Sequence, residues 1–350
     1  MKDVNNNDRH RLAEKLKFLE GDVIEVITTQ FFQHHPETGG YGESGKAHCA
    51  TDAHYHLTFL RTAIEFGTEE TFRQYVRWTT NVLQARNISQ SLLQKFLHQI
   101  SHALEPHLTD SEKKVVRAHL IESPHESLRP EAPPAPHPRS PLALHQEVFL
   151  QALLAGNRHA AGTIAFEAFS MTDSLSDVYV ELFQESLYEI GRLWESNRIS
   201  VAQEHVATAI TQYVMANVYP RVKPAQPFQG KGIITGVEGE LHQVGSHMVA
   251  DLLESQGWDI RFLGVNIPHQ AILQMIKEFR PTLVGISATM VLKVPIVRDL
   301  INDIRTHFPP EYTPRILVGG SAFRSLPDVF REIGADGFAY DLRSLTSLLA

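Results

Sequence analysis

The chain has 350 residues, of which 43% are hydrophobic and 21% charged, as expected of a globular protein with two or three domains. Its formal net charge of −8 argues against a general binder of nucleic acid or acidic membranes, and no apolar run reaches the roughly 20 residues that span a bilayer. The single cysteine, Cys49, excludes an internal disulfide. Together with an N-terminus that lacks a secretory signal, it predicts a cytoplasmic protein.

Proline-rich stretches divide the chain. Residues 124–141 hold many prolines, which favour extended polyproline conformations and predict a semi-rigid linker. A softer boundary lies in residues 219–232, where prolines end a helical stretch. We therefore expect one domain over 1–123, a second over 142–219 and a third over 231–350.

The first domain is predicted to be mostly helical. Its apolar residues keep helical spacing in two runs, which comprise Leu16, Leu19, Val23 and Val26, and then Leu92, Leu93, Phe96, Leu97 and Ile100. Between them, the glycine-rich segment 35–49 predicts a loop.

The second domain is predicted to be an antiparallel four-helix bundle, because its helical stretches have short connections. Gly156 marks a turn, and Ser200 with Gln203 forms a capping box at the start of the last helix. The expected helices cover residues 142–155, 157–170, 174–195 and 201–218.

The third domain alternates continuous apolar strands with helical patterns, which predicts a parallel sheet covered by helices on both faces. The expected strands are residues 232–237, 260–263, 283–287 and 316–318, with a weaker candidate at 337–339. Such a doubly wound domain binds its ligands beyond the carboxyl ends of the strands.

The loop after the first predicted strand carries Glu240, His242 and Gly245. A carboxylate two residues before a histidine can accept the proton of one ring nitrogen, which leaves the other oriented and more basic as a metal donor. Gly245 removes a side chain where a bulky ligand could pass close to the backbone. Alone this pattern is weak, since a surface histidine often has a chance neighbour.

Three further residues end strands at the same edge of the sheet: Ser287, Gly319 and Gly320. With the histidine loop they resemble the cobalamin-binding fold of methionine synthase, the mutases and corrinoid proteins. The resemblance implies that His242 replaces the dimethylbenzimidazole base below cobalt, and that the nucleotide tail occupies a slot lined by these residues and Thr289. Two positions depart from the family pattern: Glu240, where most members have Asp, and Thr289, where Leu is usual.

Residues of the predicted bundle point to one class of cobalamin-binding proteins. Trp194, followed after nine residues by Glu204 and His205, resembles the cap of the adenosylcobalamin photoreceptors that regulate carotenoid synthesis. The resemblance implies that Trp194 lies over the upper face of adenosylcobalamin with Glu204 and His205 nearby. These photoreceptors can place a histidine after the tryptophan, but here that residue is Glu195. A bis-histidine photoproduct from that position is therefore in doubt, and His205 is a candidate substitute.

The N-terminal domain lacks a basic recognition helix, so we expect no direct DNA binding. Its unusual feature is a polar cluster that leads into a helix: Cys49, Asp52, His54, Tyr55 and His56. Cys49, His54 and His56 could bind a metal, although no second cysteine completes a strong site. The cluster could instead line a pocket for biliverdin, with Cys49 as a possible thioether donor, because the domain layout resembles photocobilins, which carry both cobalamin and a bilin. The third alternative is capping and packing at a helix start, with Cys49 buried as a small hydrophobe.

The sequence as a whole predicts a multidomain protein with an α-helical N-terminal domain, a four-helix bundle cap and an α/β doubly wound cobalamin-binding domain. We expect a light sensor rather than an enzyme, with a signal that passes through self-association or an unknown protein partner. The main alternative is a corrinoid carrier of a methyltransferase system. Another is an antirepressor that uses the cobalamin fold as an interaction module.

Overall fold

The computed structural model describes residues 6–34, 42–122, 140–223, 225–226 and 228–349. These residues fall into two compact units, Met1–Pro133 and Pro134–Ala350. Nearly all of the predicted proline-rich linker lies outside the described residues. Within the described parts, no helix is both long and apolar enough to cross a membrane.

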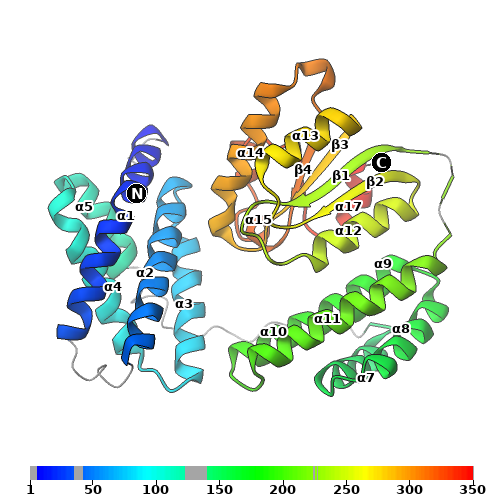
Figure 1. Cartoon of the computed structure of the whole chain (residues 1–350), viewed down its shortest axis with the longest axis horizontal. Coiled ribbons are helices and arrows are strands. Elements are labelled where there is room, and N and C mark those ends of the chain that lie inside the picture. The colour runs from blue at the N-terminus through cyan, green and yellow to red at the C-terminus, as the bar shows by residue number, and fades with distance from the viewer. Residues whose placement is uncertain (1–5, 35–41, 123–139, 224, 227, 350) are drawn as a thin grey trace. The chain divides into compact units, whose positions relative to one another are not determined.

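The first unit is helical (Figure 1). Helix α1 packs against α2 and α4, and α2 packs against α3. Most of the predicted apolar positions meet in a core that includes Leu16, Val23 and Ile100, but Val26 is exposed. The elements are α1 (Asn6–His34), α2 (Gly42–Glu65), α3 (Glu69–Ala85), α4 (Gln90–Leu104), the 3₁₀ helix η2 (Glu105–His107), α5 (Asp110–Arg117) and the π-helix η3 (Ala118–Glu122).

The prediction of a loop over residues 35–49 is wrong for the second half of that segment. Helix α2 begins at Gly42 and runs through Cys49, whereas residues 35–41 lie outside the described residues. A glycine inside a helix costs about 1 kcal/mol relative to alanine. That penalty is small beside the packing of a long helix against α1, which decides the local structure here.

The second unit begins with the four-helix bundle. Its capping box is confirmed: Ser200 Oγ accepts from the Gln203 backbone N–H at 3.2 Å, and Gln203 Oε1 accepts from the Ser200 N–H at 2.9 Å. The third predicted helix is instead a short α-helix, a π-helical stretch and a longer α-helix in direct succession. The elements are α7 (Ala143–Leu154), α8 (Arg158–Thr172), α9 (Leu175–Asp177), η4 (Val178–Gln184), α10 (Glu185–Glu195), α11 (Val201–Val218) and η5 (Tyr219–Arg221).

The parallel sheet follows the bundle in the chain, with strand order β2-β1-β3-β4-β5. Its strands are β1 (Gly230–Gly236), β2 (Trp258–Gly264), β3 (Leu283–Ser287), β4 (Arg315–Gly319) and β5 (Gly337–Ala339). The helical segments are α12 (Val244–Ser255), α13 (His269–Phe279), η6 (Val291–Lys293), α14 (Val294–His307), η7 (Pro310–Tyr312), α15 (Ser321–Ser325), α16 (Val329–Glu332) and α17 (Leu342–Leu349).

This arrangement confirms the predicted doubly wound domain. Helix α12 contacts α17, and α13 contacts α14, as Figure 1 shows for the two sides of the sheet. The chain reverses its direction of winding between β1 and β3, which are neighbours in the sheet. In open parallel sheets that reversal point is where ligands bind.

The bundle and the sheet domain share one apolar core. Met248 and Leu252 of α12 and Leu342 of α17 are buried in the same cluster as the side chains of the bundle. A polar contact crosses this interface, where the fully buried Tyr179 donates its hydroxyl proton to Asp251 Oδ2 at 2.5 Å. Burial raises the pKa of both groups. The helix that follows the His242 loop is therefore attached to the π-helical stretch of the bundle.

Tyr179→Phe is expected to lower the free energy of unfolding by about 2 kcal/mol, because it leaves a buried carboxyl without its hydroxyl partner. Urea denaturation of the purified protein measures the change. Tyr213→Phe is the matched control, since the Tyr213 side chain is exposed and its hydroxyl makes no hydrogen bond within the described residues. Equal stability of the two variants would contradict a stabilising Tyr179–Asp251 contact.

Candidate functional site

The loop between β1 and α12 holds Glu240 against His242. Glu240 is 1% exposed, although it is a carboxylate. Its Oε1 accepts the backbone N–H groups of Leu241 and His242, both at 2.9 Å, and lies 2.6 Å from His242 Nδ1. Its Oε2 accepts the backbone N–H of Thr289 at 2.8 Å. With a carboxylate as its partner, Nδ1 carries the proton, and the Nε2 lone pair of His242 is available to a metal.

The electrostatics of this pair favour an ionised carboxylate and a basic imidazole. Burial alone would raise the pKa of Glu240, but hydrogen bonds from the His242 ring and from the Thr289 and His242 backbone lower it. The hydrogen bond to Glu240 raises the pKa of His242, burial opposes that effect, and the charges of Glu240 and Glu204 add to it. A more basic imidazole is a stronger donor to a metal.

The ends of β3 and β4 lie beside this loop. In the sheet register Gly236 pairs with Ser287, and Ser287 pairs with Gly319, so that the predicted strand-end residues are neighbours along one edge. Gly320 has a φ of 101°, and a Cβ there would stand 2.3 Å from the carbonyl oxygen of Ala288. The backbone therefore packs more closely at this edge than any side chain would allow.

Gly245 lies in the first turn of α12, where a Cβ would have nothing within 4 Å. The site thus combines an imidazole with a free nitrogen, a glycine that faces open space, and a glycine-lined edge at the reversal point of the sheet. These features would suit a cofactor that takes one nitrogen donor from the protein and approaches the backbone closely.

The bundle residues predicted to cover the cofactor lie around the connection between α10 and α11. Trp194 is partly buried and packs against the bundle core. Glu204 pairs with His205 Nδ1 and accepts the Thr208 hydroxyl at 3.0 Å, while His205 remains largely exposed. The charge of Glu204, in the first turn of α11, contributes to the raised pKa of His242.

The structure does not gather the five N-terminal candidates on one surface. Cys49 and His56 are buried, whereas Asp52, His54 and Tyr55 are exposed on the same helix. His54 pairs with Glu20 of α1. Because α2 begins at Gly42, all five lie inside the helix, so the predicted helix start is wrong. The predicted burial of Cys49 is confirmed.

Burial shifts the pKa values of the two buried candidates, His56 and Cys49. It lowers the pKa of His56 to about 4, and with the charge of Asp52 it raises the pKa of Cys49 to about 11. His56 Nδ1 lies 2.7 Å from the hydroxyl of Tyr75, which stacks on Phe59 with ring centroids 3.7 Å apart. No group of three metal-binding side chains occurs within the described residues, so the metal alternative for Cys49, His54 and His56 is not supported.

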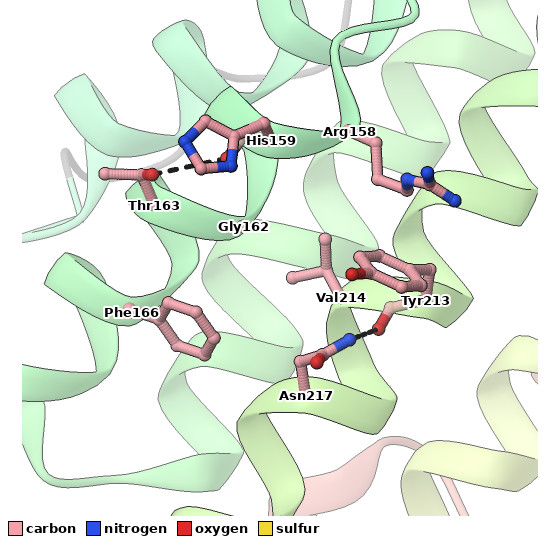
Figure 2. A pocket seen from close by; sticks show the side chains of 8 residues that line it. All are labelled: Arg158, His159, Gly162, Thr163, Phe166, Tyr213, Val214 and Asn217. Carbon is pink, nitrogen blue, oxygen red and sulfur yellow. Dashed lines mark hydrogen bonds between the residues drawn. The ribbon is translucent and has the colours of Figure 1, made fainter.

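A groove between α8 and α11 is a feature that the sequence pattern did not single out (Figure 2). Its volume is about 250 Å³. The Arg158 guanidinium lies 4.7 Å from the Tyr213 ring centroid at one end. Tyr213 is nine residues from Glu204, about two and a half helical turns, so it lies on the opposite face of α11. The lining residues are Arg158, His159, Gly162, Thr163, Phe166, Tyr213, Val214 and Asn217.

Comparisons with known proteins agree with this geometry. Two models of a B12 binding domain match residues 230–343 and 146–219. The solved structure of the Methanosarcina barkeri monomethylamine corrinoid protein superposes with a TM-score of 0.52 at 19% identity, over 59% of this chain and 98% of that one. It shares the fold. Neither domain model extends into residues 1–145.

Among curated relatives, dimethylamine corrinoid protein 1 of Methanosarcina acetivorans is 30% identical over 169 residues, which are 47% of this chain and 76% of that protein. The HTH-type transcriptional repressor CarH of Myxococcus xanthus is 25% identical over 191 residues, 52% of this chain and 60% of the repressor. Methionine synthase of Mycobacterium tuberculosis is 21% identical over 178 residues, half of this chain but only 15% of the synthase. On these matches and on the fold, the chain belongs to the family of cobalamin-binding corrinoid proteins.

Proposed function

We propose that the protein is a light sensor that holds adenosylcobalamin between the helical bundle and the sheet domain. The observation that carries the proposal is the apolar core that the bundle and the sheet domain share, where the hydrogen bond from Tyr179 to Asp251 joins the bundle to α12, the helix that follows the His242 loop. It supports a common site to which both subdomains contribute. The similarity to the repressor CarH favours a regulatory output over turnover.

In this proposal each group of site residues has a separate role in holding the cofactor. His242 would supply its Nε2 to cobalt, and Glu240 holds the imidazole and stabilises its donor tautomer. Trp194 would shield the bound cofactor from water, with Glu204 and His205 beside it. Ser287, Thr289, Gly319 and Gly320 line the slot for the tail, and Gly245 leaves room beside it. Adenosylcobalamin, when bound, supplies a cobalt–carbon bond that visible light cleaves.

The signal is proposed to be a shift between two arrangements of the bundle and the sheet domain. Helix α12 begins two residues after His242 and carries Asp251, the partner of Tyr179. A change at the histidine loop can therefore reach the bundle through one helix. Because Glu195 follows Trp194, a second histidine ligand would have to come from elsewhere in the chain, and His205 is the candidate.

The decisive experiment reconstitutes the protein with adenosylcobalamin in the dark and then illuminates it with green light. We expect irreversible loss of the adenosyl spectrum and a change of oligomer size in size-exclusion chromatography with light scattering. Trp194→Ala should retain binding through His242 and lose the size change. Cleavage of the cofactor without any change in size or shape would contradict a sensor.

A corrinoid carrier of a methyltransferase system is the second candidate, favoured by the 30% identity to a dimethylamine corrinoid protein. A carrier should pass a methyl group from methylcobalamin to a thiol acceptor in the presence of its methyltransferase, and its size should not respond to light. An antirepressor that uses the cobalamin fold only for interaction should lack both responses.

For the N-terminal unit the proposal includes biliverdin as a second chromophore. The buried contact between His56 and Tyr75 inside an aromatic cluster supports a polar anchor for such a ligand. The raised pKa of Cys49 keeps it a thiol, which disfavours a covalent bond to the chromophore. Added biliverdin should produce a red-absorbing band that survives Cys49→Ser and disappears in His56→Leu.

A further inference from the structure

Three loops meet around a lysine at the ligand edge of the sheet. Lys293 is the last residue of η6, in the connection between β3 and α14. A Cβ on Gly239, in the loop after β1, would stand 2.5 Å from Lys293 Nζ. Gly239 has a φ of 73°, and its N–H donates to Asn266 Oδ1, in the loop after β2, at 2.7 Å. The ammonium group therefore lies directly against the loop that carries Glu240 and His242.

The ammonium group of Lys293 has no counterion among the residues that the structure describes. In the part of the chain that the structure describes, Lys293 Nζ makes neither an ion pair nor a hydrogen bond. The adjacent carboxylate, Glu240, has both oxygens engaged by His242 and by the backbone N–H of Thr289. Lys293 is only partly exposed, so it loses part of its hydration without gaining a protein partner. An unpaired, partly buried cation at the binding edge of a sheet indicates an anionic ligand.

The cofactor of the family contains one such anion. The corrin ring of cobalamin carries neutral amide side chains, and the negative charge of its periphery is the phosphodiester in the nucleotide tail. We propose that Lys293 binds this phosphodiester and makes the site selective for corrinoids whose tail carries a phosphate. The proposal rests on cobalamin binding alone and does not require light sensing.

The test compares corrinoids that differ in the phosphate. Hydroxocobalamin carries the phosphodiester and the base, cobinamide phosphate carries a phosphate without the base, and cobinamide has neither. Dissociation constants are measured by absorbance titration in phosphate-free buffer for the full chain and for Lys293→Met. A charge-assisted contact predicts about tenfold weaker binding of cobalamin and cobinamide phosphate by this variant, and less than a twofold change for cobinamide. Added salt should weaken binding to the unaltered chain more than to the variant.

Two further variants separate phosphate binding from a structural effect. Lys293→Arg keeps the charge and should restore most of the affinity for cobalamin. Lys277→Met removes an exposed lysine of α13 and should change none of the three constants. Equal weakening of all three corrinoids by Lys293→Met would overturn the proposal, because it would place the effect on the His242 loop. Unchanged binding of cobalamin would overturn it as well.

Discussion

His242→Ala is expected to weaken cobalamin binding by about 100-fold and to remove the spectrum of histidine-ligated cobalamin. Loss of a partner that only orients a metal ligand already costs 10- to 100-fold in metal affinity, so loss of the ligand itself should reach at least the upper end of that range. Titration of hydroxocobalamin followed by absorbance measures both effects. Because the side chain of His242 is mostly exposed in the absence of cofactor, the variant should fold normally.

Two further variants test whether the loss of binding is specific to His242 and its partner. Glu240→Gln keeps the size of the side chain but removes the charge that holds the imidazole, and it should weaken binding by about tenfold. His159→Ala removes an exposed histidine in the groove between α8 and α11 and should leave the spectrum unchanged. A histidine-ligated spectrum in His242→Ala would show that another residue binds cobalt, and the site would then have to be reassigned.

Much of the fold could be predicted from the sequence because its signals are local. The capping box of Ser200 and Gln203 and the apolar strands are determined by residues a few positions apart. The π-helical stretch at Val178–Gln184 has no comparable signature, since so short a stretch adds only about one residue to a pattern that otherwise keeps helical spacing. The start of α2 at Gly42 was missed because tertiary packing outweighs the low helix propensity of glycine there.

The candidate site likewise contains contacts between residues close in the sequence, which could be predicted, and contacts between distant residues, which could not. The spacing of Glu240 and His242 predicts their contact, since two residues in one turn must lie close together. The backbone N–H of Thr289, which binds the other oxygen of Glu240, is 49 residues away, and only the sheet brings it near. The same holds for Lys293 beside Gly239 and for Tyr75 beside His56. Nothing in the sequence around these residues indicates a partner so distant along the chain.

The glycines of the site are expected to respond to alanine in different ways. At Gly320 a methyl group would meet the carbonyl oxygen of Ala288 at 2.3 Å, in a backbone conformation that favours glycine. Gly320→Ala should therefore lower the free energy of unfolding by about 3 kcal/mol or more, as measured by urea denaturation without cofactor. At the adjacent Gly319 the nearest atom is the carbonyl oxygen of Ala339 at 3.4 Å, an ordinary contact, so Gly319→Ala should cost less than about 1 kcal/mol.

Gly245→Ala completes the comparison because it separates folding from binding. A methyl group there meets nothing within 4 Å, and alanine favours the helix by about 1 kcal/mol, so the variant without cofactor should be at least as stable as the unaltered chain. If the open space belongs to cobalamin, the same methyl group should weaken cobalamin binding by about tenfold. Stability would then rise while affinity falls, a combination that damage to the fold cannot produce. Full affinity in Gly245→Ala would instead place the cofactor away from this turn of α12.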